Sequence, residues 1–250
     1  MEYGHVPSMC SPYGWRARVG LIVPSTNTVN EPEFWMMAGT GVTIHASRLL
    51  VGGPSDRAAF ERMDEGIDLA VRQLDTAEVD IVAYGCTTGS ILSDSDAMVD
   101  RISAGIRAPV VTTAQAIVEA LKALNVRQVA VGTPYNEFLN RSEHAFLEHH
   151  GFEVQSLHAL QLPEHEERRR VIGRISSEAV YRLARAADRP SAQAILLSCT
   201  NLATLEVIER LESELGKPVV SSNQATFWAC MRRLGLPVKD GRHGRLFDIA

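Results

Sequence analysis

The stretch AILLSCTNL at residues 194–202 is an apolar run that ends in Cys199 and continues with hydroxyl and amide side chains. The same pattern occurs once before, as DIVAYGCTTG at residues 80–89, where Cys86 holds the equivalent position. A short, continuous apolar run bounded by a turn is typical of a buried strand in a parallel sheet. We therefore interpret both stretches as buried strands, each with a thiol at its carboxyl end.

Other parts of the chain also recur, at an offset of about 110 residues, which is too long for a solenoid repeat and indicates duplicated domains. The run RVGLIVPS at 18–25 corresponds to RQVAVGTPY at 127–135, and PVVTT at 109–113 corresponds to PVVSS at 218–222. Strands that alternate with helices form a parallel sheet covered on both faces. The sequence therefore predicts an α/β fold of two similar Rossmann-like lobes, related by a pseudo-two-fold axis, with the active site between them.

The repeat also sets the expected boundaries. We expect an N-terminal tail at 1–15, a first lobe at 16–125 and a second lobe at 126–220, with residues 221–250 able to pack back on the first lobe. Beyond the Gly-Pro turn at 52–55, apolar residues recur at helical spacing and predict one amphipathic helix. These residues are Phe60, Met63, Ile67, Ala70, Val71 and Leu74.

Composition excludes several classes of protein. The chain has 250 residues, 45% of them hydrophobic, and a formal charge of −5, which suits one or two ordinary cores and argues against nucleic acid as the main partner. No apolar run approaches the roughly 20 residues of a membrane span, and residues 1–14 lack the pattern of a secretory signal. The four cysteines form neither a disulfide framework nor a zinc motif. We expect a cytoplasmic protein with free thiols and with no metal or cofactor.

The residues just beyond the strand ends are the candidates for ligand binding, because ligands of open α/β sheets bind outside the carboxyl ends of the strands. In this chain these positions are rich in hydroxyl and amide groups and poor in Lys and Arg. This pattern predicts that a small carboxylate is held by hydrogen bonds rather than by ion pairs. The candidate substrate-binding residues are Ser25, Asn27, Thr87, Thr88, Tyr135, Thr200 and Asn201.

Cys86 and Cys199 are the candidate catalytic residues. An isolated buried cysteine is usually a small apolar side chain, and Cys10 and Cys230 keep that interpretation. Cys86 and Cys199 instead occupy equivalent places in the two lobes, where a following helix N-terminus is expected to lower the thiol pKa. Two opposed thiols could exchange a proton at a carbon beside a carboxylate, or one could add to an activated double bond that rotates before elimination.

Several motifs together resemble those of the aspartate/glutamate racemase superfamily, in its branch of maleate cis-trans isomerases and arylmalonate decarboxylases. They are VPSTN at 23–27, GCTT at 85–88, TPY at 133–135, LSC at 197–199 and PVVSS at 218–222. The resemblance implies that Cys199 is the catalytic thiol of both activities. It implies that Cys86 is the second cysteine of the isomerases, where the decarboxylases have glycine. It also implies that Asn27 and Tyr135 hold the substrate carboxylate.

Two departures from the isomerase pattern leave the substrate open. Thr87, Thr88 and Gly89 replace an apolar segment, and the loop after Leu160 reads PEHE at 163–166 where the isomerases have a substrate-binding asparagine. The charge run at 164–170 is typical of a solvated helix face, with an active-site lid as the alternative.

We expect a homo-oligomeric, cofactor-independent isomerase of a small mono- or dicarboxylic acid such as maleate, acting as a cis-trans isomerase or as a racemase. The alternatives are an arylmalonate-type decarboxylase with Cys199 as proton donor and a small-acid-binding protein without catalysis.

Overall fold

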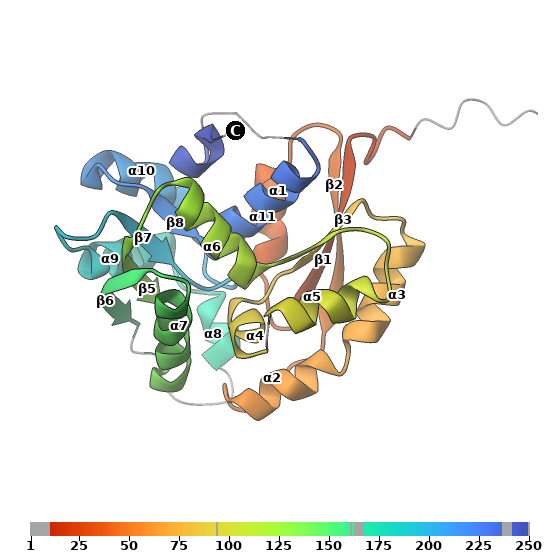
Figure 1. Ribbon diagram of the computed structural model, residues 1–250, viewed down its shortest axis with the longest axis horizontal. Helices are drawn as coiled ribbons and strands as arrows, with labels where there is room; N and C mark the ends of the chain where they lie inside the picture. Colours follow the sequence, from red (N-terminus) through yellow and green to blue (C-terminus); the bar gives the residue numbers. More distant parts are fainter. Residues whose placement is uncertain (1–10, 94, 161, 163–167, 237–241, 250) are drawn as a thin grey trace, which may run out of the picture.

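The computed structural model describes residues 11–93, 95–160, 162, 168–236 and 242–249. It contains two four-stranded sheets, in which all neighbouring strands run parallel (Figure 1). The predicted α/β fold with two parallel sheets is therefore confirmed. Residues 1–10 of the expected tail, Cys10 among them, and the loop at 163–166 lie outside the described residues.

The two sheets have the same strand order. The first is β2-β1-β3-β4, formed by β1 (Ala17–Pro24), β2 (Val42–Leu49), β3 (Ile81–Tyr84) and β4 (Val110–Thr112). The second is β6-β5-β7-β8, formed by β5 (Gln128–Thr133), β6 (Glu153–Ala159), β7 (Ala194–Leu197) and β8 (Val219–Ser221). The strand order thus repeats along with the sequence.

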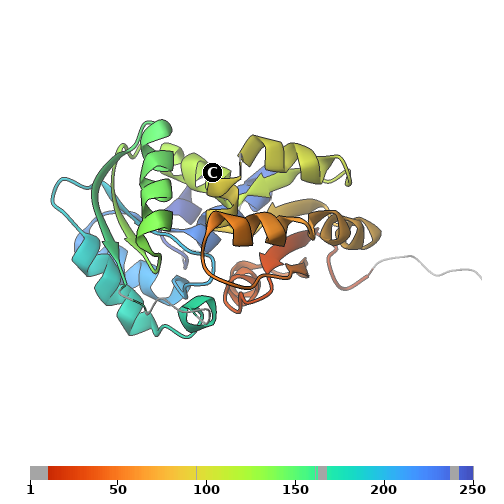
Figure 2. The same cartoon turned by 90° about the horizontal axis from the view of Figure 1, so that it is seen from below.

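Helices connect the strands and pack around the sheets (Figures 1 and 2). In chain order they are α1 (Asn30–Met37), α2 (Arg57–Asp64), α3 (Ile67–Thr76), α4 (Thr87–Leu92), α5 (Ser95–Ser103), α6 (Thr113–Ala123), α7 (Glu137–His149), α8 (Arg168–Ile172), α9 (Ser177–Ala187), α10 (Leu205–Leu215), α11 (Ser222–Arg233) and the 3-10 helix η1 (Arg245–Asp248). Among the described helices, none has the length and apolar character that crossing a membrane requires.

The strand register brings the two cysteine turns to corresponding edges. In the first sheet Ile22 of β1 pairs with Tyr84 of β3, so Cys86 follows directly beyond the sheet. In the second sheet Gly132 pairs with Leu197, which places Cys199 at the equivalent edge. Both β3 and β7 are buried along their whole length, as expected for strands covered on both faces.

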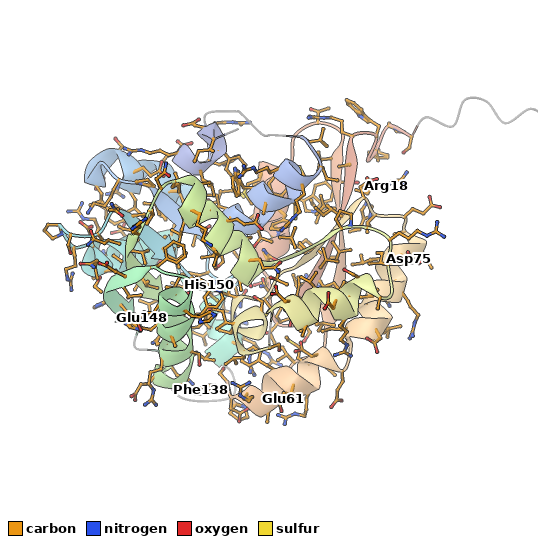
Figure 3. The ribbon with its side chains drawn as sticks, in the orientation of Figure 1. Arg18, Glu61, Asp75, Phe138, Glu148 and His150 are labelled. Atoms are coloured by element: carbon orange, nitrogen blue, oxygen red, sulfur yellow. The ribbon has the colours of Figure 1, made fainter. Side chains whose placement is uncertain are left out.

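The predicted single helix after residue 55 is wrong in one respect, since the chain forms two helices, α2 and α3, separated at residues 65–66. Glycine is a poor helix former, and at Gly66 the N–H turns back to the carbonyl of Met63. A Cβ at position 66 would also lie 3.3 Å from Leu49 Cδ2, so the helix passes close to β2 there. The predicted apolar face remains buried, and Glu61 and Asp75 point outward (Figure 3).

Helices α6 and α11 join the two halves and lie side by side (Figure 1). The hydroxyl of Thr226 on α11 donates to that of Thr113 on α6, at 3.1 Å. The ring of Phe227 meets Phe34 of α1 edge-on, with 5.3 Å between ring centroids. Helix α11 also contacts β3 and β4, so part of the C-terminal segment packs on elements of the first sheet.

Helices α1 and α7 carry equivalent buried carboxyl groups, because Asn30-x-x-Glu33 recurs as Asn140-x-x-Glu143. Glu33 is well supplied with donors: its carboxylate accepts the backbone N–H groups of Thr204 and Leu205 and the side-chain amide of Asn223. These bonds hold the start of α10 against α1.

The carboxyl group of Glu143 has fewer hydrogen-bond partners among the described residues than that of Glu33. Its Oε2 atom is buried and has no hydrogen-bond partner among the described residues. Burial raises the pKa of Glu143 to about 7, although the Ser198 hydroxyl nearby acts in the opposite direction. Glu143 is therefore a buried acid that the fold keeps protonated in mildly acidic solution.

We predict that Gly85→Ala lowers the free energy of unfolding by about 1–3 kcal/mol, measured by urea denaturation. A Cβ at residue 85 would lie 2.2 Å from Asn30 Oδ1 and 3.0 Å from Leu21 Cδ1, so the packing before Cys86 must shift. The matched control is Gly52→Ala, because nothing lies within 4 Å of a Cβ there. Its effect is expected to stay within about 0.5 kcal/mol. Equal effects of the two substitutions would contradict this explanation.

We also predict that Glu143→Gln changes how stability depends on pH. The folded-state pKa of about 7 lies above the ordinary value of 4.5, so the contribution of protonated Glu143 is complete below pH 4.5 and is lost as the pH rises through 7. Above that pH, the free energy of unfolding of wild type is lower by up to about 3 kcal/mol, whereas that of Glu143→Gln does not fall in this way. Urea denaturation over this pH range measures the difference, with exposed Glu137→Gln on the same helix as control. Parallel pH profiles for wild type and Glu143→Gln would refute the assignment.

Candidate active site

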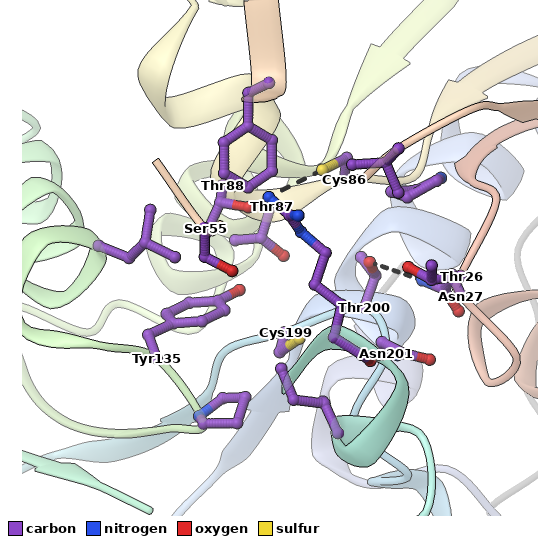
Figure 4. Close-up of a pocket in the computed structure, with 17 residues that line it drawn as sticks. Thr26, Asn27, Ser55, Cys86, Thr87, Thr88, Tyr135, Cys199, Thr200 and Asn201 are labelled. Atoms are coloured by element: carbon purple, nitrogen blue, oxygen red, sulfur yellow. Dashed lines mark hydrogen bonds between the residues drawn. The ribbon is translucent and has the colours of Figure 1, made fainter. Parts of the chain in front are cut away.

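A small cavity lies where the strand ends of the two sheets meet, and residues from both halves line it (Figure 4). They are Pro24, Thr26, Asn27, Val51, Ser55, Phe60, Cys86, Thr87, Thr88, Pro134, Tyr135, Leu139, Arg169, Ile172, Cys199, Thr200 and Asn201. The cavity volume is about 60 Å³. One water needs roughly 10–15 Å³ by this measure, so the space suits a small molecule rather than a nucleotide or a polymer. Within the described part of the chain, no group of three or more His, Cys, Asp and Glu side chains is arranged to hold a metal ion.

The structure brings together all the sequence-predicted site residues except Ser25. Cys86 and Cys199 both border the cavity, with Thr87, Thr88, Tyr135, Thr200, Asn201 and Asn27 around them (Figure 4). Ser25 has a different role, because its Oγ accepts the N–H of Val51 at 3.1 Å and its own N–H donates to Leu49. Ser25 thus shapes the turn after β1 and does not line the cavity.

Cys86 is the N-cap residue of α4. Its Sγ accepts the N–H of Gly89 at 3.3 Å and lies 3.9 Å from Thr88 Oγ1. Burial nevertheless raises the pKa of Cys86 to about 11, with the Gly89 N–H and the charge of Arg169 opposing the rise. The expected lowering of the Cys86 pKa is therefore wrong, because loss of water around the thiolate outweighs the donors of one short helix.

Cys199 follows β7 and is separated from the next helix, since α10 begins only at Leu205. Its backbone N–H donates to Ser222 Oγ at 3.1 Å. Burial raises the pKa of Cys199 to about 12, while the N–H of Asn201 and the hydroxyl of Tyr135 stabilise the thiolate in part. The expectation of a lowered pKa is wrong for this thiol too, again because of burial.

Buried hydrogen bonds connect the turns from the two halves. Asn27 Nδ2 donates to Thr200 Oγ1 at 3.0 Å, and Thr200 Oγ1 donates in turn to the carbonyl of Gly85 at 3.1 Å. The hydroxyl of Thr87 donates to Ser222 Oγ at 2.9 Å, the same atom that accepts the N–H of Cys199. The two cysteine-bearing turns are therefore held in fixed positions relative to each other.

Two of the predicted binding residues also organise the protein around the cavity. Asn27 Oδ1 accepts the N–H groups of Val29 and Asn30 and so supports the start of α1. Asn201 Oδ1 accepts the N–H of Thr28, and its Nδ2 donates to the carbonyl of Arg169 at 2.9 Å. Most of the donors and acceptors of these amides are thus used within the protein, although both side chains border the cavity.

Arg169 on α8 is a lining residue that the sequence analysis missed. The strand-end positions are poor in Lys and Arg, as the sequence shows, but α8 adds a positive charge to the cavity lining. The solvated-face interpretation of the charge run at 164–170 is therefore wrong at Arg169. The guanidinium of Arg169 donates to the carbonyls of Gly53 and Pro54, at 2.6 and 3.0 Å, and lies over the ring of Phe60. Its neighbour Arg170 is exposed, and no local sequence signal distinguishes the two.

Comparison with known proteins gives the same family as the motifs. A family model described as arylmalonate decarboxylase matches residues 19–247. A maleate isomerase of Nocardia farcinica is 30% identical over 244 residues, covering 92% of this chain and 94% of that relative.

Two solved structures have the same fold over nearly the whole chain. The maleate isomerase of Pseudomonas putida S16 with maleate superposes with a TM-score of 0.86 at 26% identity, covering 94% of this chain and 98% of that one. A cysteine-to-serine mutant of the Nocardia farcinica maleate cis-trans isomerase, with a covalently bound succinylcysteine intermediate, gives a TM-score of 0.84 at 26% identity, covering 92% and 98%. The chain therefore belongs to the arylmalonate decarboxylase and maleate isomerase family of the Asp/Glu racemase superfamily, whose members are cofactor-independent isomerases and decarboxylases.

Proposed function

We propose that this protein is a cis-trans isomerase of a small dicarboxylic acid such as maleate, with Cys86 and Cys199 as its catalytic residues. The observation that carries the proposal is that both thiols, one from each half, border one small cavity. The similarity to maleate isomerases, one with maleate and one with a succinylcysteine, supports this activity over racemisation.

In the proposed reaction the Cys86 thiol first loses its proton to solvent, and the thiolate adds to one carbon of the double bond. A sulfur–carbon bond forms, the π electrons move to the adjacent carbon, and that carbon takes the proton of the Cys199 thiol. The resulting single bond rotates. The Cys199 thiolate then removes the proton, the double bond re-forms, and the sulfur–carbon bond breaks to release the trans acid. Atoms and electrons balance without a cofactor.

The electrostatic surroundings support this assignment of roles. The charge of Arg169 favours a thiolate at Cys86, in opposition to burial and to the carboxylate of Asp64. The largest influences on the Cys199 pKa include no cation, and Glu143 and Cys86 both disfavour ionisation of this thiol. A thiol that resists ionisation suits a proton donor, and one beside a guanidinium suits a nucleophile.

The hydroxyl groups around the cavity are suited to bind the carboxylate beside the reacting carbon. The available hydroxyl groups are those of Thr88, from the first cysteine turn, and Tyr135, from the turn after β5. The hydroxyl groups of Thr87 and Thr200 hold their turns in place, because each already donates its one proton within the protein. Negative charge on these carboxylate oxygens increases as the thiolate adds, so donors fixed by the fold stabilise that state.

Decarboxylation of a substituted malonate is the second candidate, favoured by the family model that the chain matches. In that reaction a carbon–carbon bond breaks, carbon dioxide leaves with the carboxylate carbon, and the Cys199 thiol protonates the carbanion. Release of carbon dioxide distinguishes it from isomerisation, which is balanced without any loss of carbon.

We predict that Cys86→Ser and Cys199→Ser each reduce conversion of maleate to fumarate by at least about 10²-fold, because each removes one of two groups that handle the bond or the proton. Fumarate is followed by absorbance or chromatography, and phenylmalonate is assayed in parallel for carbon dioxide. Cys10→Ser is the control and is expected to keep full activity.

Loss of activity in only one of the two cysteine variants would contradict the paired-thiol mechanism. Carbon dioxide release from phenylmalonate without maleate turnover would establish the decarboxylase instead. Binding of these acids without conversion would establish a binding protein.

We also predict that Cys86 is alkylated by iodoacetamide far more slowly than free glutathione at neutral pH. With a pKa of about 11, on the order of 10⁻⁴ of the thiol is ionised at pH 7, and the thiolate is the reacting form. Peptide mapping by mass spectrometry against pH is expected to give a rate that still rises above about pH 9, beyond the ordinary thiol pKa near 8.5. A plateau at or below that ordinary value would indicate that the α4 N-terminus outweighs burial.

A further inference from the structure

Arg169 is the one charged residue among the described residues that line the cavity. Burial lowers the pKa of this guanidinium, since the charged form has lost part of its water. Removing a charge from water is unfavourable unless an opposite charge or enough hydrogen bonds replace the water. The surroundings of Arg169 therefore indicate what the cavity is built to bind.

The described residues accept only some of the N–H donors of this guanidinium. Two of the five N–H donors of an arginine are used here, by the carbonyls of Gly53 and Pro54. Among the described residues, no carboxylate lies within ion-pair distance of Arg169. Asp56 is near enough to favour the charged form, but its carboxylate accepts the N–H of Ala59 at the start of α2.

The position of the guanidinium is nevertheless well defined. Its carbon lies 5.2 Å from the centroid of the Phe60 ring, and the two carbonyls fix its orientation. The carbonyl of Arg169 accepts the amide of Asn201, which ties α8 to the Cys199 turn. Arg169 thus lines the cavity together with Cys86 and has N–H donors that no described residue accepts. This is the arrangement that recognises a carboxylate by paired, charge-assisted hydrogen bonds.

We infer that Arg169 binds the second carboxylate of a dicarboxylate substrate at the Cys86 side of the cavity and so selects dicarboxylates over monocarboxylates. The identity of the substrate rests on the function proposed above. The first carboxylate is received by hydroxyl groups and the second by a guanidinium, so the two ends of the molecule are distinguished. The Cys86 thiol is largely neutral before reaction and does not supply the missing negative charge.

Binding of succinate and of succinamate tests this inference by isothermal titration calorimetry. Succinate has no double bond to isomerise, and succinamate replaces one carboxylate by an amide of similar shape. Wild type is expected to prefer succinate. Arg169→Gln is expected to weaken succinate binding at least about tenfold and succinamate binding less than threefold, because only succinate loses a charged partner. Arg169→Lys is expected to restore part of the preference.

Arg62→Gln is the matched control, because Arg62 is an exposed arginine on α2 whose charge also acts on Arg169 but which does not line the cavity. It is expected to leave both affinities unchanged. Equal weakening of both ligands in Arg169→Gln would overturn the inference and leave Arg169 as a structural link to the 53–54 turn. Unchanged binding of both, or no binding of succinate to wild type, would overturn it too.

The inference and the proposed isomerase activity can fail separately. Arg169-dependent binding of succinate by a protein that does not convert maleate would support the binding role and reject the isomerase. If wild type converts maleate and Arg169→Gln keeps the wild-type preference for succinate, the isomerase is supported and the binding role of Arg169 is rejected.

Discussion

One buried hydroxyl group, that of Ser222 at the start of α11, connects the two halves at the point on which the site depends. It accepts a hydrogen bond from the Thr87 side chain in the first cysteine turn and another from the backbone of Cys199 in the second. Ser222 is fully buried, so water does not compete for either bond. The capping box formed by Ser221 and Gln224 fixes the start of the helix that carries it. Residues from both halves of the chain thereby line a single cavity.

Burial of the two thiols beside the cavity opposes the ionisation that the proposed chemistry needs. Burial raises the pKa of both Cys86 and Cys199, and the helix that begins after Cys86 does not reverse the effect. A buried thiolate needs a compensating charge, and Arg169 is the cation that the described lining provides. The same guanidinium is positioned to meet an anionic ligand. In the proposed reaction the one positive charge of Arg169 therefore acts both on the ionisation of Cys86 and on the second carboxylate of the substrate, and these two anions compete for it.

The sequence was sufficient for the fold and for most of the cavity, because both follow from local patterns. Buried runs ending in Cys86 and Cys199 identify parallel strands, and the carboxyl ends of such strands gather polar residues at one edge. The features it missed depend on packing between distant segments. Arg169 enters the cavity because the turn at 53–54 accepts it, and Ser25 is excluded because Val51 uses its hydroxyl. The thiol pKa values depend on enclosure, which no sequence pattern measures.

The central claim is that Cys86 and Cys199 act on the same molecule, one as nucleophile and the other as proton donor. Mass spectrometry of Cys199→Ser incubated with maleate tests it most directly. In this variant the carbanion takes its proton slowly from water, and the thiolate that would remove that proton again is missing, so the adduct is expected to be retained. The predicted result is a mass increase of one maleate, located on the Cys86 peptide as a succinylcysteine. An unmodified protein, or an adduct confined to Cys10 or Cys230, would contradict the claim.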